Sequence, residues 1–131
     1  MPLQRLAIDT VTAVAAGTTS TIVSVTNSKI TYVRTLIIHA SAIESSTPDA
    51  PVNVQIYVVP NVGGNVGTAS SLNRIARINL AASDTFFLEP EYPINLDTNG
   101  DSIQLFNEGN FYGGGNQYPV NVLAMGDRDD S

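Results

Sequence analysis

The sequence contains no cysteine, which excludes disulfides, thiolate catalysis and zinc–sulfur sites. Charged residues are also scarce, at 14% of the 131 residues, whereas roughly a quarter is usual for a soluble domain. No stretch approaches the roughly 18 apolar residues of a membrane span, so we expect no membrane partner. The start, MPLQRLAIDT, lacks a charged region followed by a long apolar core, and we therefore expect no secretion through a signal peptide.

Basic residues are few and are spread along the chain. Six Lys plus Arg stand against twelve Asp plus Glu, which gives a net charge of −6. The six basic residues are Arg5, Lys29, Arg34, Arg74, Arg77 and Arg128. Because a nucleic-acid-binding protein needs a basic face to neutralise phosphates, we expect no DNA or RNA partner.

What the sequence does contain fits one folded domain over residues 1–131. That length allows a single continuous core, and 43% of the residues are hydrophobic. Thr, Ser and Asn stand in place of charged residues, so we expect a polar rather than an ionic surface. Stability then has to come from packing or assembly.

Short strands separated by turn residues dominate the pattern. In VNVQIYVV, residues 52–59, apolar side chains alternate with polar ones, which is typical of a strand with one buried face. ITYVRTLIIHASAI, residues 30–43, is continuously apolar in its middle, which predicts a central strand covered on both faces. Weaker strand signals occur in QRLAIDTVTAV, STIVSVT, DTFFLE, DSIQLF and QYPVNVLAM. We predict an all-β fold: a single antiparallel β-sandwich of about eight strands, with the jelly roll as the candidate arrangement.

The segment SSLNRIARINL, residues 70–80, fits two patterns. Its apolar spacing suits a helix with a serine N-cap, whereas the alternation of Ala76, Ile78 and Leu80 suits a strand. We favour a strand from Arg74 to Leu80, because AASD then forms a short turn into DTFFLE and completes a hairpin.

NVGGNVGT, residues 61–68, follows the strand VQIYVV and raises the question of a phosphate-binding loop. The P-loop requires a lysine before its Ser or Thr, whereas here Gly67 is followed directly by Thr68. The dinucleotide pattern fails as well, and the βαβ context of both motifs is missing. The residues therefore predict a turn. We also hypothesise that Gly63, Gly64 and Gly67 form a side-chain-free surface that the backbone of a neighbouring subunit approaches closely.

DTNGD, residues 97–101, resembles the opening of a calcium loop, with Asp97, Asn99 and Asp101 at alternate positions. The EF-hand pattern places glycine after the third ligand, whereas Gly100 precedes it here, and no helix follows. Asn-Gly between INL and SIQL favours a hairpin turn, and a calcium site is the weaker alternative.

Candidate catalytic residues are sparse. His39 is the only histidine and lies in the most apolar strand, and one buried-looking histidine does not define a triad, so we predict a structural role. Glu89 and Glu91 flank a proline in LEPEYP, which favours a polar edge over a general acid/base pair. We predict no enzyme, no catalytic residue and no cofactor.

Loops and chain ends are the remaining candidates for contacts. The loops comprise residues 44–51, 61–71 and 108–117. The last of them, EGNFYGGGNQ, displays Phe111 and Tyr112 between glycines. We expect residues 1–10 to act as an arm on a neighbour, and residues 126–131, which are acidic, to form a flexible tail.

The succession YVRTLIIHAS, VNVQIYVVPNVGGNVGTASSLNRIARINLAASDTFFLE and INLDTNGDSIQLF resembles small β-sandwich virion structural proteins of tailed bacteriophages. In those proteins a strand ending in YVVP is followed by a glycine loop and an NRI strand. The likeness covers roughly residues 20–107 and is a pattern of strands and turns without a catalytic motif. EGNFYGGGNQYPV departs from it, being longer and richer in glycine than a simple final hairpin.

The resemblance implies a virion structural role, with no site residues to carry over because such proteins act through surfaces. The first expectation is a capsid decoration (cement) protein, made in the host cytoplasm, that binds the major capsid protein and associates with itself as a trimer. The alternatives are a neck, tail or baseplate component, or a receptor- or glycan-binding module at a tail tip. In that last case Phe111, Tyr112 and Tyr118 would be the stacking residues.

Overall fold

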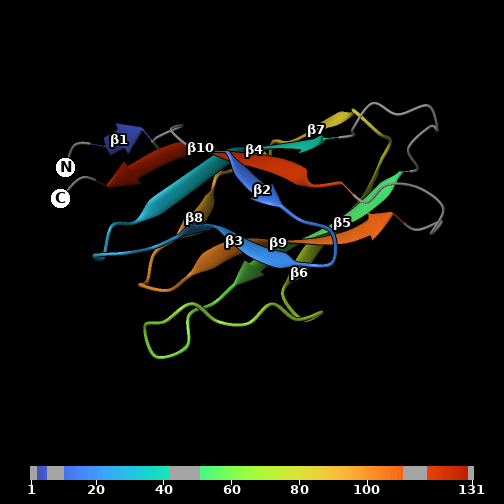
Figure 1. The fold of residues 1–131 in the computed structure, drawn as a ribbon. Coiled ribbons are helices and arrows are strands. Elements are labelled where there is room, and N and C mark those ends of the chain that lie inside the picture. Colours follow the sequence, from blue (N-terminus) through green and yellow to red (C-terminus); the bar gives the residue numbers. More distant parts are fainter. Residues whose placement is uncertain (1–2, 6–10, 42–50, 111–117, 130–131) are drawn as a thin grey trace.

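The computed structural model describes residues 3–5, 11–41, 51–110 and 118–129, and Figure 1 shows them as two layers of strands. Within these ranges there is no helix, and so none that could cross a membrane. The strands are β1 (Leu3–Arg5), β2 (Thr12–Val14), β3 (Thr19–Ser24), β4 (Thr31–Ala40), β5 (Val52–Val59), β6 (Arg74–Leu80), β7 (Thr85–Leu88), β8 (Ile94–Leu96), β9 (Ser102–Asn110) and β10 (Val120–Asp129).

Each layer is one antiparallel sheet. The first sheet has six strands in the order β1-β10-β4-β7, with β2 also paired to β10 and β8 also paired to β4. The second sheet has four strands in the order β3-β9-β5-β6. The prediction of an all-β antiparallel sandwich is confirmed.

The strands pair in the manner of one long hairpin rolled up on itself. β5 pairs with β6, β4 with β7 and β8, β3 with β9, and β1 and β2 with β10. β1 and β2 pair with the same strand and together form one interrupted strand, and so do β7 and β8. Counted in this way, the ten strands become eight. Eight strands nested in this way in two sheets form a jelly roll. The tip of the long hairpin is the connection 60–73, which contains NVGGNVGT.

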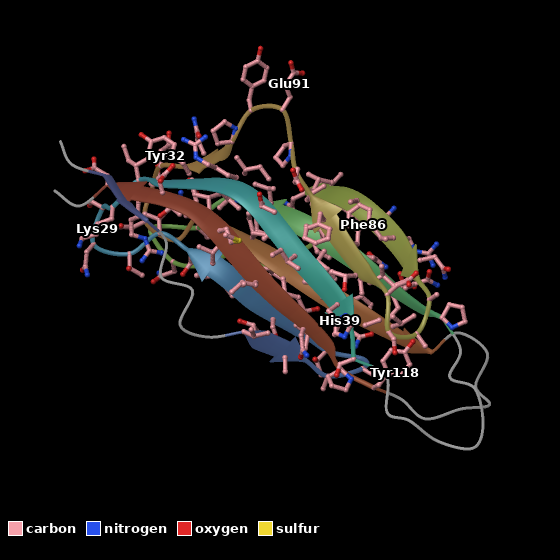
Figure 2. The ribbon with its side chains drawn as sticks, turned by 90° about the horizontal axis from the view of Figure 1, so that it is seen from above. Lys29, Tyr32, His39, Phe86, Glu91 and Tyr118 are labelled. Atoms are coloured by element: carbon pink, nitrogen blue, oxygen red, sulfur yellow. The ribbon has the colours of Figure 1, made fainter. Side chains whose placement is uncertain are left out.

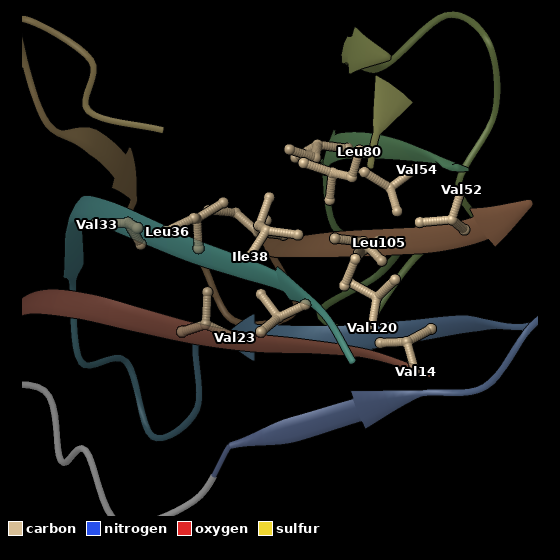
Figure 3. Close-up of a cluster of buried hydrophobic side chains, with 14 of the residues drawn as sticks. Val14, Val23, Val33, Leu36, Ile38, Val52, Val54, Leu80, Leu105 and Val120 are labelled. Atoms are coloured by element: carbon tan, nitrogen blue, oxygen red, sulfur yellow. The ribbon is translucent and has the colours of Figure 1, made fainter. Parts of the chain in front are cut away.

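The core lies between the two sheets, where inward-facing side chains of both meet (Figure 3). In β4, Leu36 and Ile38 are buried, whereas Ile37 between them is only half-buried. The expectation that this strand is covered on both faces is therefore wrong, because the described residues leave the outer face of the first sheet partly exposed at Ile37. Val54 and Ile56 of β5 complete the core from the second sheet, and each such buried side chain contributes about 1.5–3 kcal/mol to stability.

The strand predicted for Arg74–Leu80 is confirmed as β6, but the hairpin predicted after it is wrong. β6 pairs with β5 in the second sheet and β7 pairs with β4 in the first, so residues 81–84 carry the chain from one sheet to the other. The same holds for residues 97–101, which connect β8 of the first sheet to β9 of the second. A tight turn with positive φ suits a hairpin and a sheet-to-sheet crossing equally, so its residues alone do not distinguish the two.

The C-terminal segment is a strand rather than a tail as far as the structure describes it. Residues 126–129, expected to be flexible, continue β10, and residues 127–129 pair with residues 3–5 of β1. Those residues of the predicted N-terminal arm therefore belong to this chain's own sheet. Glycine at 126 fits a bulge in β10, because a Cβ there would lie 1.9 Å from the backbone oxygen of Tyr32.

Candidate interaction surface

The glycine loop is a tight two-residue turn. Val62 and Asn65 exchange two backbone hydrogen bonds of 2.8 and 3.1 Å around Gly63 and Gly64. Both glycines have positive φ, 59° and 84°, which is the geometry of a type I′ turn. A Cβ added at either glycine would meet nothing within 4 Å. The predicted turn is confirmed, and it presents bare backbone to the outside.

This turn is fastened to the segment DTNGD. The backbone N–H and the side-chain Nδ2 of Asn61 both donate to Oδ1 of Asp101, each at 2.9 Å. A Cβ at Gly100 would lie 2.5 Å from the backbone oxygen of Asn65, so glycine is required for the two segments to touch. The two motifs therefore form one structural unit, although their first residues, 61 and 97, are 36 positions apart in the sequence.

The rest of the loop lies on the outer face of the second sheet, below it in Figure 1. Gln104 of β9 donates from Nε2 to the backbone oxygen of Gly67 at 2.9 Å. A Cβ at Gly67 would lie 2.6 Å from the oxygen of Pro60 and 3.1 Å from a methyl group of Val59. Val59 is buried even though it lies at the end of β5, which is consistent with the loop covering it. Of the three glycines in the neighbouring-subunit hypothesis, Gly67 thus packs against its own chain, while Gly63 and Gly64 face outward.

The oxygens of Asp97, Asn99 and Asp101 each accept hydrogen bonds from within the chain. Asn99 Oδ1 accepts from the backbone N–H of Ser28 at 2.7 Å, Asp101 Oδ2 from that of Thr98 at 3.1 Å, and Asp97 Oδ1 from the Thr98 hydroxyl at 3.2 Å. Burial acts to raise the pKa of Asp101, but hydrogen bonds from Asn61 and from backbone N–H groups outweigh it, so the pKa is lowered. Across the described residues no three or more His, Cys, Asp or Glu side chains are grouped to hold a metal ion.

Exposed apolar side chains are concentrated on this loop and at the start of β6. Leu72 is 94% exposed and Val62 68%, and Val66 and Ile75 are also exposed. The backbone at Leu72 is held by a hydrogen-bonded turn. The N–H of Asn73 donates to the backbone oxygen of Ser70 at 3.0 Å, and Asn73 Oδ1 accepts from the backbone N–H of Ser70 at 2.9 Å. Several exposed apolar side chains grouped on one segment are typical of contact surfaces.

A polar cluster on the second sheet lies next to these residues. Arg77 of β6 binds Glu108 of β9 through two hydrogen bonds of 2.8 and 3.0 Å, and Gln55 Nε2 donates to the same carboxylate at 2.9 Å. The Arg77 hydrogen bond lowers the pKa of Glu108 and outweighs the effect of burial, and the charge of Arg74 also contributes. Arg74 itself donates to Gln55 at 3.2 Å and has no carboxylate within ion-pair distance among the described residues.

A second exposed group lies at the connection between β7 and β8, which projects from the molecule at Glu91 in Figure 2. Tyr92 is 77% exposed and Phe87 54%. Glu89 and Glu91 are exposed and have no hydrogen-bond or ion-pair partner in the described part of the chain. Sequence reasoning placed the carboxylates at a polar edge but missed the two aromatics, although the spacing PEYP around Tyr92 indicated an exposed turn.

The other predicted residues are more dispersed. Phe111 and Tyr112 lie outside the described residues, as does most of loop 44–51. Tyr118 is buried in the core, so its predicted role as a surface stacking residue is wrong. His39 is only half-buried: it lies on the outer face of the first sheet, and its Nδ1 is 2.9 Å from the hydroxyl of Thr85.

The bulge in β10 opens a shallow hollow of about 480 Å³ on the first sheet. It is lined by Arg34, Thr35, Met125, Gly126 and Asp127. Arg34 and Asp127 form an ion pair across it, which leaves the hollow close to neutral. Gly126 and Asp127 belong to the predicted tail, but no lining residue was predicted to be catalytic or to bind a ligand.

Comparison with known proteins identifies no relative: no family model matches the chain, and no curated protein or solved structure is significantly similar to it.

Proposed function

We propose that the chain is a structural protein of a tailed-bacteriophage virion, a capsid decoration protein that binds the lattice of the major capsid protein and stabilises the head. The observation that carries the proposal is the anchored glycine turn, which holds bare backbone at Gly63 and Gly64 between the exposed side chains of Val62 and Val66. The segments that resemble virion proteins form β4, the β5–β6 hairpin with this turn, β7, and β8 with β9.

A side-chain-free turn suits such a role because a partner's backbone can approach it closely. Anchoring by Asp101 limits the conformational entropy lost on binding, since the loop is already ordered. One contact of this size is weak, but repetition over a symmetric lattice gives many simultaneous contacts and a large total stability. Jelly rolls occur widely in capsid proteins and also in lectins, so the fold supports this class of function without selecting it.

The proposal is tested by locating the protein in purified particles by electron microscopy. Density distributed over the capsid supports it, density at a single vertex or along the tail favours the neck, tail or baseplate alternative, and absence from particles contradicts both.

A binding experiment tests the surface itself. Val62→Asp should abolish rebinding to particles stripped of the protein, because an ionised carboxylate would be placed in the contact. Val11→Asp is the matched control, since Val11 is 55% exposed and lies outside the loop, and it should bind as wild type does. Equal binding by both variants would exclude the glycine turn as the contact.

A further inference from the structure

We propose that copies of this chain associate head to tail, with residues 72–75 of one copy docking on residues 87–92 of the next. The first group combines Leu72 and Ile75 with Arg74, and we name it the basic segment. The second combines Phe87 and Tyr92 with Glu89 and Glu91, and we name it the acidic segment. This inference does not depend on the virion role.

The basic segment offers an apolar contact beside an available cation. Leu72 is 94% exposed at the tip of a hydrogen-bonded turn, and Ile75 follows it at the edge of the second sheet. Arg74, between them, makes one side-chain hydrogen bond, to Gln55, so most of its five donors remain free to bind a carboxylate. Arg77 is different, because Glu108 already binds it through two hydrogen bonds.

The acidic segment offers the complementary features. Phe87 and Tyr92 expose large apolar surfaces, and Glu89 and Glu91 lie between them without partners in the described residues. Aromatic side chains and arginine are the residue types most enriched at the energetic centres of protein interfaces. A guanidinium that reaches either carboxylate while Leu72 packs on Tyr92 would satisfy both segments.

The two segments lie at different places on the molecule, and their charges determine which of them can meet. The basic segment belongs to β6, the edge of the second sheet, and the acidic segment to β7 and its connection to β8, at the edge of the first. If two basic segments met, two Arg74 side chains would face each other, and if two acidic segments met, four carboxylates would. Both arrangements are repulsive. Unlike segments therefore meet, and repeating this head-to-tail contact builds closed rings or open filaments.

Cysteine cross-linking tests this arrangement without background, because the sequence has no cysteine. Leu72→Cys and Tyr92→Cys are made as separate proteins, one carrying a mass tag, and are mixed and oxidised. The proposal expects the mixed disulfide to dominate and each variant alone to stay mostly uncross-linked. Dominant Leu72→Cys homodimers would show that like segments meet and would overturn it, and so would the absence of any cross-link.

Charge exchange tests the chemistry. Arg74→Glu, and separately Glu89→Lys with Glu91→Lys, should each weaken assembly in sedimentation velocity by about ten-fold or more, since like charges then face each other. The triple variant should regain assembly, which a misfolded protein would not do. Thr21→Glu, an exposed change on the opposite edge strand β3, is the control and should assemble normally. A wild type that is monomeric at all concentrations, or a triple variant that stays monomeric, contradicts the proposal. Loss of assembly in these variants while particles still bind single copies would leave the virion role intact.

Discussion

Asn107 connects the two sheets, and its replacement by alanine should be among the most damaging single changes in the chain. Its side chain is fully buried in β9 of the second sheet. Nδ2 donates to the backbone oxygens of Val14 at 3.0 Å and Tyr118 at 3.2 Å, at the end of β2 and before β10 of the first sheet. Oδ1 accepts from the N–H of Gly109 at 2.8 Å.

The magnitude follows from the groups that Asn107→Ala leaves without a partner. Two carbonyl oxygens and one N–H lose a hydrogen bond, and each buried unsatisfied group costs about 1–3 kcal/mol. Allowing for partial relaxation, we expect a loss of about 3–5 kcal/mol, which is a large part of the 5–15 kcal/mol or so typical of a whole domain. For a chain of this size that corresponds to a fall in Tm of about 10–15 °C.

Denaturant unfolding and calorimetry measure this loss. Asn95→Ala is the control, because Asn95 is exposed on β8 and should change stability by less than about 0.5 kcal/mol. Asn107→Asp sharpens the test: its carboxylate keeps the acceptor for Gly109 but directs negative charge at two carbonyl oxygens. The pKa of the introduced carboxyl should therefore rise, and the damage should grow as the pH rises through it. A loss below about 1 kcal/mol for Asn107→Ala would refute the reasoning.

Two further predictions concern the bulge glycine and the partly buried carboxylates of Asp101 and Glu108. Gly126→Ala should be strongly destabilising in thermal melts, because its Cβ would lie 1.9 Å from a backbone oxygen. Gly17→Ala is the control: Gly17 has a φ of 79° and open space around it, so the change should cost only about 1 kcal/mol. Equal falls in Tm for the two variants would argue against the clash. The pKa values of Glu108 and Asp101 are lowered on folding, so their stabilisation is complete above their unfolded pKa values of about 4 and is lost as the pH falls through the folded ones. Glu108→Gln should flatten the acid limb of unfolding free energy against pH, and an unchanged limb would assign it to other carboxylates.

The strands could be predicted from sequence because each depends on a local alternation. β6 shows this, since Ala76, Ile78 and Leu80 face inward as their period of two requires, and the competing helical spacing had no face to bury against. The connections could not be assigned, because whether residues 81–84 and 97–101 close a hairpin or cross to the other sheet depends on the partners of the strands they join. Those partners are set by long-range pairing of β4 with β7 and β8.

The candidate surface divides in the same way. Glycine and asparagine at 61–65 predicted a turn, and the positive φ angles of Gly63 and Gly64 confirm it. The attachment of that turn to Asp101 could not be read from sequence, because it joins segments that only the folded sandwich brings together. Leu72 was missed because apolar residues in a β-rich sequence are ordinarily assigned to the core, whereas the turn signal PEYP around Tyr92 was present but was interpreted only for its carboxylates.

The position of the glycine turn in the rolled hairpin explains why it is ordered. A hairpin tip ordinarily extends into solvent, but rolling of the hairpin brings the connection between β8 and β9 against this tip. There Asp101 accepts hydrogen bonds from the N–H groups of Asn61, and Gly100 leaves room for Asn65. The same crossing is tied to the first half of the chain, because Gly100 donates to the backbone oxygen of Val25 at 3.0 Å. The turn therefore becomes rigid only when both halves of the hairpin have folded. Its outward glycines and valines are then in place only in the completed jelly roll, which suits the assembly role that we propose.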